Sequence, residues 1–291
     1  MRIRNRALAL CVAVSTASCI LAPAASAQDA FNGIVAEPIE HNAADATLKM
    51  KPIGSHLSGI FDESAAEIVA FHPDSKRLLT VNANDGRIDI LDATDPANLK
   101  PAGTIDAGSD KEINSVAVRE DGLAVAAVQQ ADKTANGEAL FFNAATGETL
   151  GSVEVGALPD MVTITDDGKH ALIANEGEPA NELDAATKDY TVDPEGSVAV
   201  ISLPESVAAA TQADTRIADF KAFDAEGALP AGVRVFGPEG SKGLPSQDLE
   251  PEYIATKDGK AYVTLQENNA IAVVDIASAT VTEIWPAHVV D

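Results

Sequence analysis

Nine carboxylates in the second half of the chain have the residue types and the spacing of a cation site. They fall in two groups of short motifs, one within residues 158–196 and one within residues 247–270. Carboxylate oxygens without nearby His or Cys are the ligands that calcium and magnesium prefer, whereas zinc and copper favour nitrogen and sulfur. The candidate ligands are Asp160, Glu176, Glu178, Asp193, Glu195, Asp248, Glu250, Glu252 and Glu267.

Two roles for a bound cation, and one alternative without a cation, remain open for these carboxylates. Calcium would either tie neighbouring elements together or hold a phosphate ester against a metal-activated water. No Lys or Arg falls within the motifs to clamp a phosphate, although loops could bring in Lys188, Arg234 and Lys242. In the alternative, the carboxylates cap strands and accept hydrogen bonds from loop amides, and the protein is an interaction module with no site.

Other catalytic signatures are absent from the sequence. It contains no G-x-S-x-G elbow, phosphate-binding loop, H-E-x-x-H helix or glycine-rich dinucleotide turn, so no nucleotide, haem or quinone cofactor is predicted. The five histidines are scattered along the chain, and we expect them to be lone surface residues. They are His41, His56, His72, His170 and His288.

A repeat of short strands positions the acidic motifs. Each unit has an alternating apolar strand, a tight turn, a second strand, a polar connection and a third strand that ends in Asp or Asn. The turns are marked by Asp74, Asp121, Asp167 and Asp258, at intervals of 47, 46 and 91 residues. A period in the forties with tight Asp-Gly turns is typical of β-propeller blades.

The repeat predicts an all-β fold with about four recognisable blades. A weaker fourth strand is visible in three units, and the long third interval holds an extended loop between Glu176 and Gly196. The connection 204–247 is either an atypical blade around 216–223 or a surface excursion, and we favour the excursion. The predicted strands are 67–71, 77–81, 87–92, 99–105, 114–118, 123–128, 139–143, 149–155, 160–164, 171–174, 196–201, 252–256, 261–265, 270–275 and 281–285.

The blade arrangement predicts where the carboxylates meet. Residues at the start of the inner strands line one rim of the central channel, so the acidic motifs should converge there. Carboxylates at close range repel one another unless a cation or hydrogen-bond donors neutralise them. Four blades are at the low end of what closes a ring, and the chain stops just after a blade, so we expect an incomplete ring.

The N-terminus predicts export. Three arginines at positions 2, 4 and 6 precede an apolar run over 7–22, and Ala25 to Ala27 provides the small residues of a cleavage site after Ala27. The run is short and is followed by Pro23, which favours a signal peptide over a membrane anchor. We therefore expect a signal peptide over 1–27, an N-terminal arm over 28–54 that reaches its first strand near Leu57, and a propeller domain over 55–291.

The mature chain is strongly acidic. The full sequence carries 20 basic and 45 acidic residues, a net charge of −25, and removal of 1–27 takes away three arginines and leaves −28. This charge disfavours nucleic acid and anionic membranes as partners. Both cysteines, Cys11 and Cys19, lie in the segment predicted to be removed, so the core must stabilise the mature protein without a disulfide.

The motifs together resemble the choice-of-anchor I family of secreted or cell-surface bacterial propellers, which are akin to mesenchyme-specific cell-surface glycoproteins and are often labelled alkaline phosphatase-like. The resemblance implies a YVTN-type or quinoprotein-dehydrogenase-like propeller, without implying a quinone. Members are usually longer, so it also implies a C-terminally truncated member. The motifs are 61–68, 114–116, 156–162, 174–179, 193–197, 248–254 and 265–270.

These observations lead to one functional expectation and one alternative. We expect a secreted, periplasmic or cell-surface scaffold that binds an unidentified cell-surface or extracellular ligand, has no membrane span in its mature form, and carries a divalent cation at the acidic rim. The alternative is a calcium-dependent alkaline phosphatase or phosphodiesterase that uses Glu176, Glu250, Glu252 and Glu267 around the metal.

Overall fold

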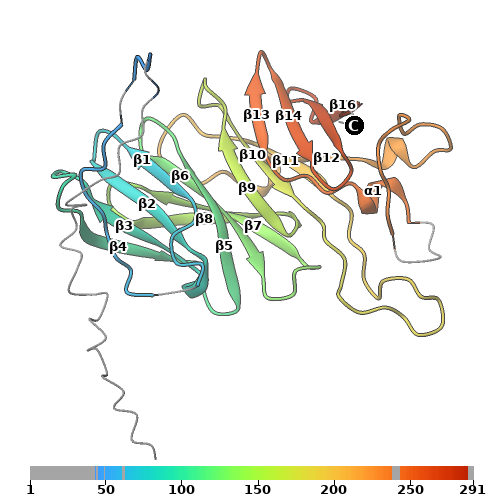
Figure 1. The fold of residues 1–291 in the computed structure, drawn as a ribbon, viewed down its shortest axis with the longest axis horizontal. Coiled ribbons are helices and arrows are strands. Elements are labelled where there is room, and N and C mark those ends of the chain that lie inside the picture. The colour runs from blue at the N-terminus through green and yellow to red at the C-terminus, as the bar shows by residue number, and fades with distance from the viewer. Residues whose placement is uncertain (1–42, 44, 49, 61–62, 238–242, 288–291) are drawn as a thin grey trace, which may run out of the picture. The chain divides into compact units, whose positions relative to one another are not determined.

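The fold consists of four consecutive four-stranded antiparallel sheets, which we call blades 1 to 4 (Figure 1). The computed structural model describes residues 43, 45–48, 50–60, 63–237 and 243–287. The predicted signal peptide, both cysteines, His41, His288 and Lys242 lie outside these residues. Within each blade the strands pair in chain order, so that every strand lies beside the one before it.

The sixteen strands match the predicted ones closely. Each of the fifteen predicted strands is present within three residues of its expected bounds. The strands are β1 (Val69–His72), β2 (Arg77–Asn82), β3 (Arg87–Asp92) and β4 (Lys100–Asp106) in blade 1, β5 (Lys111–Val118), β6 (Leu123–Gln130), β7 (Asn136–Asn143) and β8 (Glu148–Ala157) in blade 2, β9 (Pro159–Ile164), β10 (His170–Asn175), β11 (Ser197–Ser202) and β12 (Thr215–Asp219) in blade 3, and β13 (Ile254–Lys257), β14 (Lys260–Leu265), β15 (Ala270–Asp275) and β16 (Thr280–Pro286) in blade 4.

Strand β12 corrects the interpretation of the connection 204–247. Residues 215–219 pair antiparallel with β11, with Ile217 opposite Ala199, and supply the fourth strand of blade 3. The connection is therefore neither a further blade nor only an excursion. The remainder, after β12, carries a short 3₁₀ turn over Lys221–Phe223 and the helix α1 over Pro245–Asp248. The arm also differs from expectation, because among the described residues no strand precedes Val69 and none begins near Leu57.

Three apolar cores join the blades face to face. One core lies between blades 1 and 2, the second between blades 2 and 3, and the third between blades 3 and 4. Strand β6 shows how the sequence builds them, because its residues 123–128 are all fully buried. Ala124, Ala126 and Val128 enter the first core, while Leu123, Val125 and Ala127 enter the second. Successive side chains of a strand point to opposite faces, so one continuous apolar run serves two interfaces.

Basic side chains also fasten each blade to the next. His72 is buried, with Nδ1 2.7 Å from the Ser75 hydroxyl and Nε2 3.0 Å from the Glu120 carbonyl oxygen of blade 2. Arg119 of blade 2 donates to the carbonyl oxygens of Gly168 and Pro204 at 3.1 and 2.8 Å.

The expectation of lone surface histidines is therefore wrong for His72, because the turn of blade 2 covers its ring: a Cβ placed on Gly122 would lie 3.1 Å from the imidazole. His170 is half-buried, and desolvation lowers its pKa. His56 is exposed, as predicted. Burial by the neighbouring blade thus decides the environment of a histidine that lies beside a turn.

Candidate functional site

The strand registers bring the predicted acidic motifs to one edge of blades 3 and 4. In blade 3 the start of β9 lies opposite the end of β10, with Pro159 paired to Asn175. In blade 4 the start of β13 likewise faces the end of β14, since Ile254 pairs with Val263. Because antiparallel neighbours begin and end at the same edge of a sheet, residues before one strand meet residues after the next. We call the resulting set the acidic rim. It consists of Asp160, Glu176, Glu178, Glu250, Glu252 and Glu267.

Mutual repulsion shows that the acidic rim spans both blades. Burial, followed by the charges of Glu178, Asp160 and Glu250, raises the pKa of Glu176 to about 8. Burial, together with smaller contributions from repulsion by Glu178 and Glu267, raises the pKa of Glu250 to about 7. Each carboxylate thus lies within electrostatic range of partners on the other blade. The role of these six residues as cation ligands stays a prediction.

Two carboxylates of the acidic rim contact a side chain that stabilises their negative charge. Glu178 forms an ion pair with Lys133 of blade 2. Glu252 accepts a hydrogen bond from the Gln266 amide, while burial and a hydrogen bond shared with Glu267 raise its pKa. Among the described residues, the ion pair with Lys133 is the only one that involves the acidic rim. Lys133 lies outside the acidic motifs, and no motif spacing selects it as their partner.

Glu67 joins this set although it was not predicted. Burial raises the pKa of Asp160, and the carboxylates of Glu178 and Glu67 add to the rise. Glu67 lies two residues before β1, Glu252 lies two residues before β13, and Asp160 is the second residue of β9, so all three lie at the start of an inner strand. The repeat therefore carried a usable signal, because Glu67, Asn114, Asp160 and Glu252 occupy equivalent positions in the four units.

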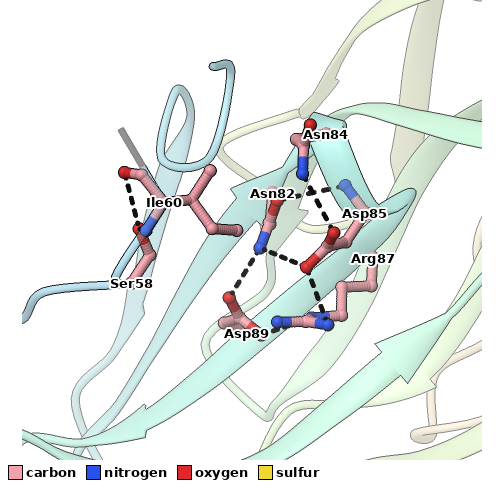
Figure 2. A network of polar contacts seen from close by, with 7 residues as sticks. All are labelled: Ser58, Ile60, Asn82, Asn84, Asp85, Arg87 and Asp89. Carbon is pink, nitrogen blue, oxygen red and sulfur yellow. Dashed lines mark hydrogen bonds and ion pairs between the residues drawn. The ribbon is translucent and has the colours of Figure 1, made fainter. Parts of the chain in front are cut away.

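Blade 1 shows a neutralised version of the same edge (Figure 2). Arg87, at the start of β3, lies 2.9 Å from an oxygen of Asp85 in the preceding turn and 2.8 Å from an oxygen of Asp89 on the same strand. Asn82, which is fully buried at the end of β2, donates to the carboxylates of Asp85 and Asp89 at 3.3 and 3.1 Å. In blade 1 the guanidinium group of Arg87 thus neutralises the carboxylates at this edge.

The three remaining predicted ligands, Asp248, Asp193 and Glu195, have different environments. The Asp248 carboxylate accepts hydrogen bonds from the backbone N–H groups of Phe236 and Gly237 at 2.7 and 2.8 Å, as the strand-capping alternative expects. Burial, followed by repulsion from Asp248, raises the pKa of Asp193 to about 6. Glu195 lies 3.0 Å from the Lys221 ammonium, outside the acidic rim.

A buried amide organises the backbone beneath the acidic rim. Asn268 is fully buried, and its Oδ1 accepts a hydrogen bond from the Glu250 N–H at 3.2 Å. Its Nδ2 donates to the carbonyl oxygens of Arg234 and Asp248 at 2.9 and 2.6 Å. The Asn268 side chain therefore ties its own segment to two others, one at Arg234 and one at 248–250. A buried polar group of this kind is costly unless it is satisfied, so its hydrogen bonds define a single arrangement of these segments.

The donor set of the acidic rim suits a hard cation, but it does not form a closed ligand cage. In the part of the chain that the structure describes, no group of three or more His, Cys, Asp or Glu residues is placed to hold a metal ion. The carboxylates are close enough to repel, and a cation would be attracted to their combined charge.

The family model for the choice-of-anchor I domain matches residues 67–291. The chain belongs to the choice-of-anchor I family. This membership is in keeping with a secreted or cell-surface protein, and among the described residues no helix is both long enough and apolar enough to cross a bilayer. A search of curated proteins gives no match.

Solved structures with a similar arrangement of strands share little sequence with this choice-of-anchor I protein. The β-propeller domain of Cps50 (Swd1) from Myceliophteria thermophila is 8% identical, with a TM-score of 0.49, over 76% of this chain and 59% of that one. A functionally unknown protein from Desulfotomaculum acetoxidans is 10% identical, with a TM-score of 0.48, over 86% and 62%. A protein of unknown function from Bacteroides caccae is 13% identical, with a TM-score of 0.42, over 76% and 61%. The chain thus spans about six-tenths of the length of these structures, and similarity of this degree carries no functional argument.

Proposed function

We propose that this protein is an exported binding scaffold of the choice-of-anchor I family, and that a divalent cation stabilises its acidic rim. The observation that carries the proposal is the repulsion between the acidic-rim carboxylates of blades 3 and 4, which have only one ion pair among the residues that the structure describes. Export rests on the signal peptide predicted over 1–27, and the acidic surface suits a secreted protein.

The contrast between the blades supports the cation. At its own edge, blade 1 balances Asp85 and Asp89 with Arg87. At the edges of blades 3 and 4, Glu176 and Glu250 have no such partner among the described residues, and burial makes their charged forms unfavourable. A divalent cation would restore the balance with oxygen ligands, and calcium is the expected ion because it accepts flexible and partly hydrated coordination.

The test is a thermal unfolding experiment on the full chain in chelator and in calcium. We expect calcium to raise Tm, and we expect an equal ionic strength of sodium chloride to have a smaller effect. The double variant Glu176→Gln/Glu250→Gln should lose most of the calcium response, while Glu148→Gln, an exposed residue of β8, should retain it. An unchanged Tm in calcium would refute the cation, and an equal response in sodium would show general screening only.

The phosphatase alternative stays a prediction. Of the basic residues considered for it, Arg234 lies over the Phe236 ring, with its guanidinium carbon 5.9 Å from the ring centroid, and Lys188 lies on an exposed loop. Turnover of p-nitrophenyl phosphate in calcium, abolished by Glu252→Gln, would support it. We therefore regard the scaffold as the function that the geometry supports best.

A further inference from the structure

A small cavity beside the acidic rim combines aromatic walls with carboxylates. Its volume is about 220 Å³, and it lies between the loop after β10 and the connection before β13. Tyr190 and Phe236 contribute the aromatic surface, and Phe236 is 58% exposed. The acidic lining residues are Asp193, Asp248, Glu250 and Glu267.

The cavity is held in shape by hydrogen bonds that do not depend on a ligand. Asp248 accepts from the Phe236 and Gly237 N–H groups, which fixes the backbone that carries the aromatic wall. On the opposite side, the Gln247 amide donates to the Asp193 carbonyl oxygen at 2.8 Å. These bonds occupy the oxygens of Asp248, so the lining carboxylates that remain to contact a ligand are Asp193, Glu250 and Glu267. A cavity with its walls fixed in advance spends little binding energy on ordering them.

The lining chemistry selects an organic cation. Among the residues that the structure describes, no Lys or Arg lines the cavity. The π face of an aromatic ring attracts an ammonium or guanidinium group, and Phe236 already receives the Arg234 guanidinium carbon at 5.9 Å. A hydrated metal ion gains nothing from such walls. The volume is below the range of about 300–1,000 Å³ that drug-sized ligands fill, which fits one extended side chain.

We infer that this cavity binds the alkylammonium or guanidinium group of a basic ligand, such as a lysine or arginine side chain presented by a partner polypeptide. The carboxylates pair with the cationic head, and Phe236 and Tyr190 cover its alkyl stem. The inference deepens the proposed binding role and rests on it. The cavity shares Glu250 and Glu267 with the acidic rim, but Asp193, Tyr190 and Phe236 lie outside the rim, so the inference does not require the divalent cation.

The experiment is an NMR titration of the full chain with N-acetyl-lysine amide, N-acetyl-arginine amide and the neutral isostere N-acetyl-norleucine amide. We expect the two cations to bind with the same set of shifted resonances and the neutral compound to bind at least fivefold more weakly. Equal binding of the neutral compound would overturn the inference. Separate titrations with cadaverine and with a lysine-centred tripeptide distinguish a free amine from a polypeptide source.

Variants separate the cavity from the acidic rim. Phe236→Leu keeps an apolar side chain but removes the ring, and we expect it to weaken binding of the cations about two- to fivefold. Asp193→Asn should weaken binding by a similar factor, whereas Arg234→Gln, which removes the competing internal cation, should strengthen it. Matched controls are Phe71→Leu on β1 and Glu182→Gln on the same loop as Asp193.

The two proposals fail separately in these experiments. If Phe236→Leu and Asp193→Asn leave amine binding unchanged, the cavity inference is wrong even where calcium still raises Tm. If calcium has no effect while both variants weaken amine binding, the cation at the acidic rim is wrong and the cavity inference stands. Folding of each variant is checked by its Tm in chelator.

Discussion

Stability should fall with rising pH in the absence of divalent cations, and Glu176→Gln should remove much of this dependence. Folding raises the pKa of Glu176 from 4.5 to about 8, chiefly through burial and then through the charges of neighbouring carboxylates. An acid with a raised pKa holds its proton more tightly in the folded state than in the unfolded state. The stability that this proton provides is complete below about 4.5 and is lost as the pH rises through about 8.

The size of the effect follows from the two pKa values. Their difference of about 3.5 corresponds to about 5 kcal/mol for a fully buried group. Glu176 is only partly buried, so screening by solvent reduces this to about 2 kcal/mol. In a domain of this size, that amounts to about 4–8 °C in Tm. Glutamine has no proton to lose, so the variant should match the wild type near pH 4 and exceed it by this amount near pH 9.

The assay is urea unfolding of the wild type, Glu176→Gln and the exposed control Glu148→Gln at pH 4.5, 7 and 9, in chelator. We expect the variant and wild-type curves to agree near pH 4.5 and to separate progressively as the pH rises toward 8, and we expect calcium to reduce the separation by screening the same charge. A wild-type stability that is constant from pH 5 to 9 would refute the reasoning. So would a Glu176→Gln variant that is less stable than the wild type at pH 9.

Three further substitutions test the contacts between blades, each by urea unfolding. Arg119→Met should cost about 2–3 kcal/mol, because it leaves two carbonyl oxygens of blade 3 without their charged donor; a cost below about 0.5 kcal/mol would contradict this role. Asn268→Ala should cost about 2–4 kcal/mol by unpairing one N–H and two carbonyl groups, and it should also lower amine affinity, which a purely local role would leave intact. Gly196→Ala should be severely destabilising, since its Cβ would lie 1.9 Å from the Leu249 carbonyl oxygen. Gly227 has a φ of +77° but nothing within 4 Å of an added Cβ, so Gly227→Ala should cost only about 1 kcal/mol.

The strands could be predicted because each carries its own signal. Alternating or continuous apolar runs bounded by Asp-Gly turns specify a strand within a few residues, and the repeat confirms each one by its neighbours. Strand β12 lacks this signal. Its residues 215–219 include Ile217, which is 45% exposed, and one buried apolar residue, Ala218. An outer strand with little to bury does not stand out from an Ala-rich and Gly-rich connection.

The candidate site was predictable as far as the repeat extended. Equivalent positions in two blades predicted the convergence of Asp160, Glu176 and Glu252, because the register of an antiparallel sheet follows from strand order. The partners Lys133 and Asn268 were not selected, since their roles depend on loops that approach from another segment. The cavity was missed for the same reason: Phe236 reaches it through hydrogen bonds to Asp248 that no spacing rule specifies.

The packing of β6 into two cores has a consequence for the order in which the blades unfold. Because its side chains are shared alternately between two neighbours, removing one sheet from the stack exposes half of that strand and weakens the next junction as well. Unfolding should therefore begin at an outermost blade and proceed to the adjacent blades in order, because each blade that unfolds exposes part of the core of the next. A polar substitution at Val125 would disrupt the core between blades 2 and 3. Blades 1 and 2 should then unfold in a separate transition from blades 3 and 4.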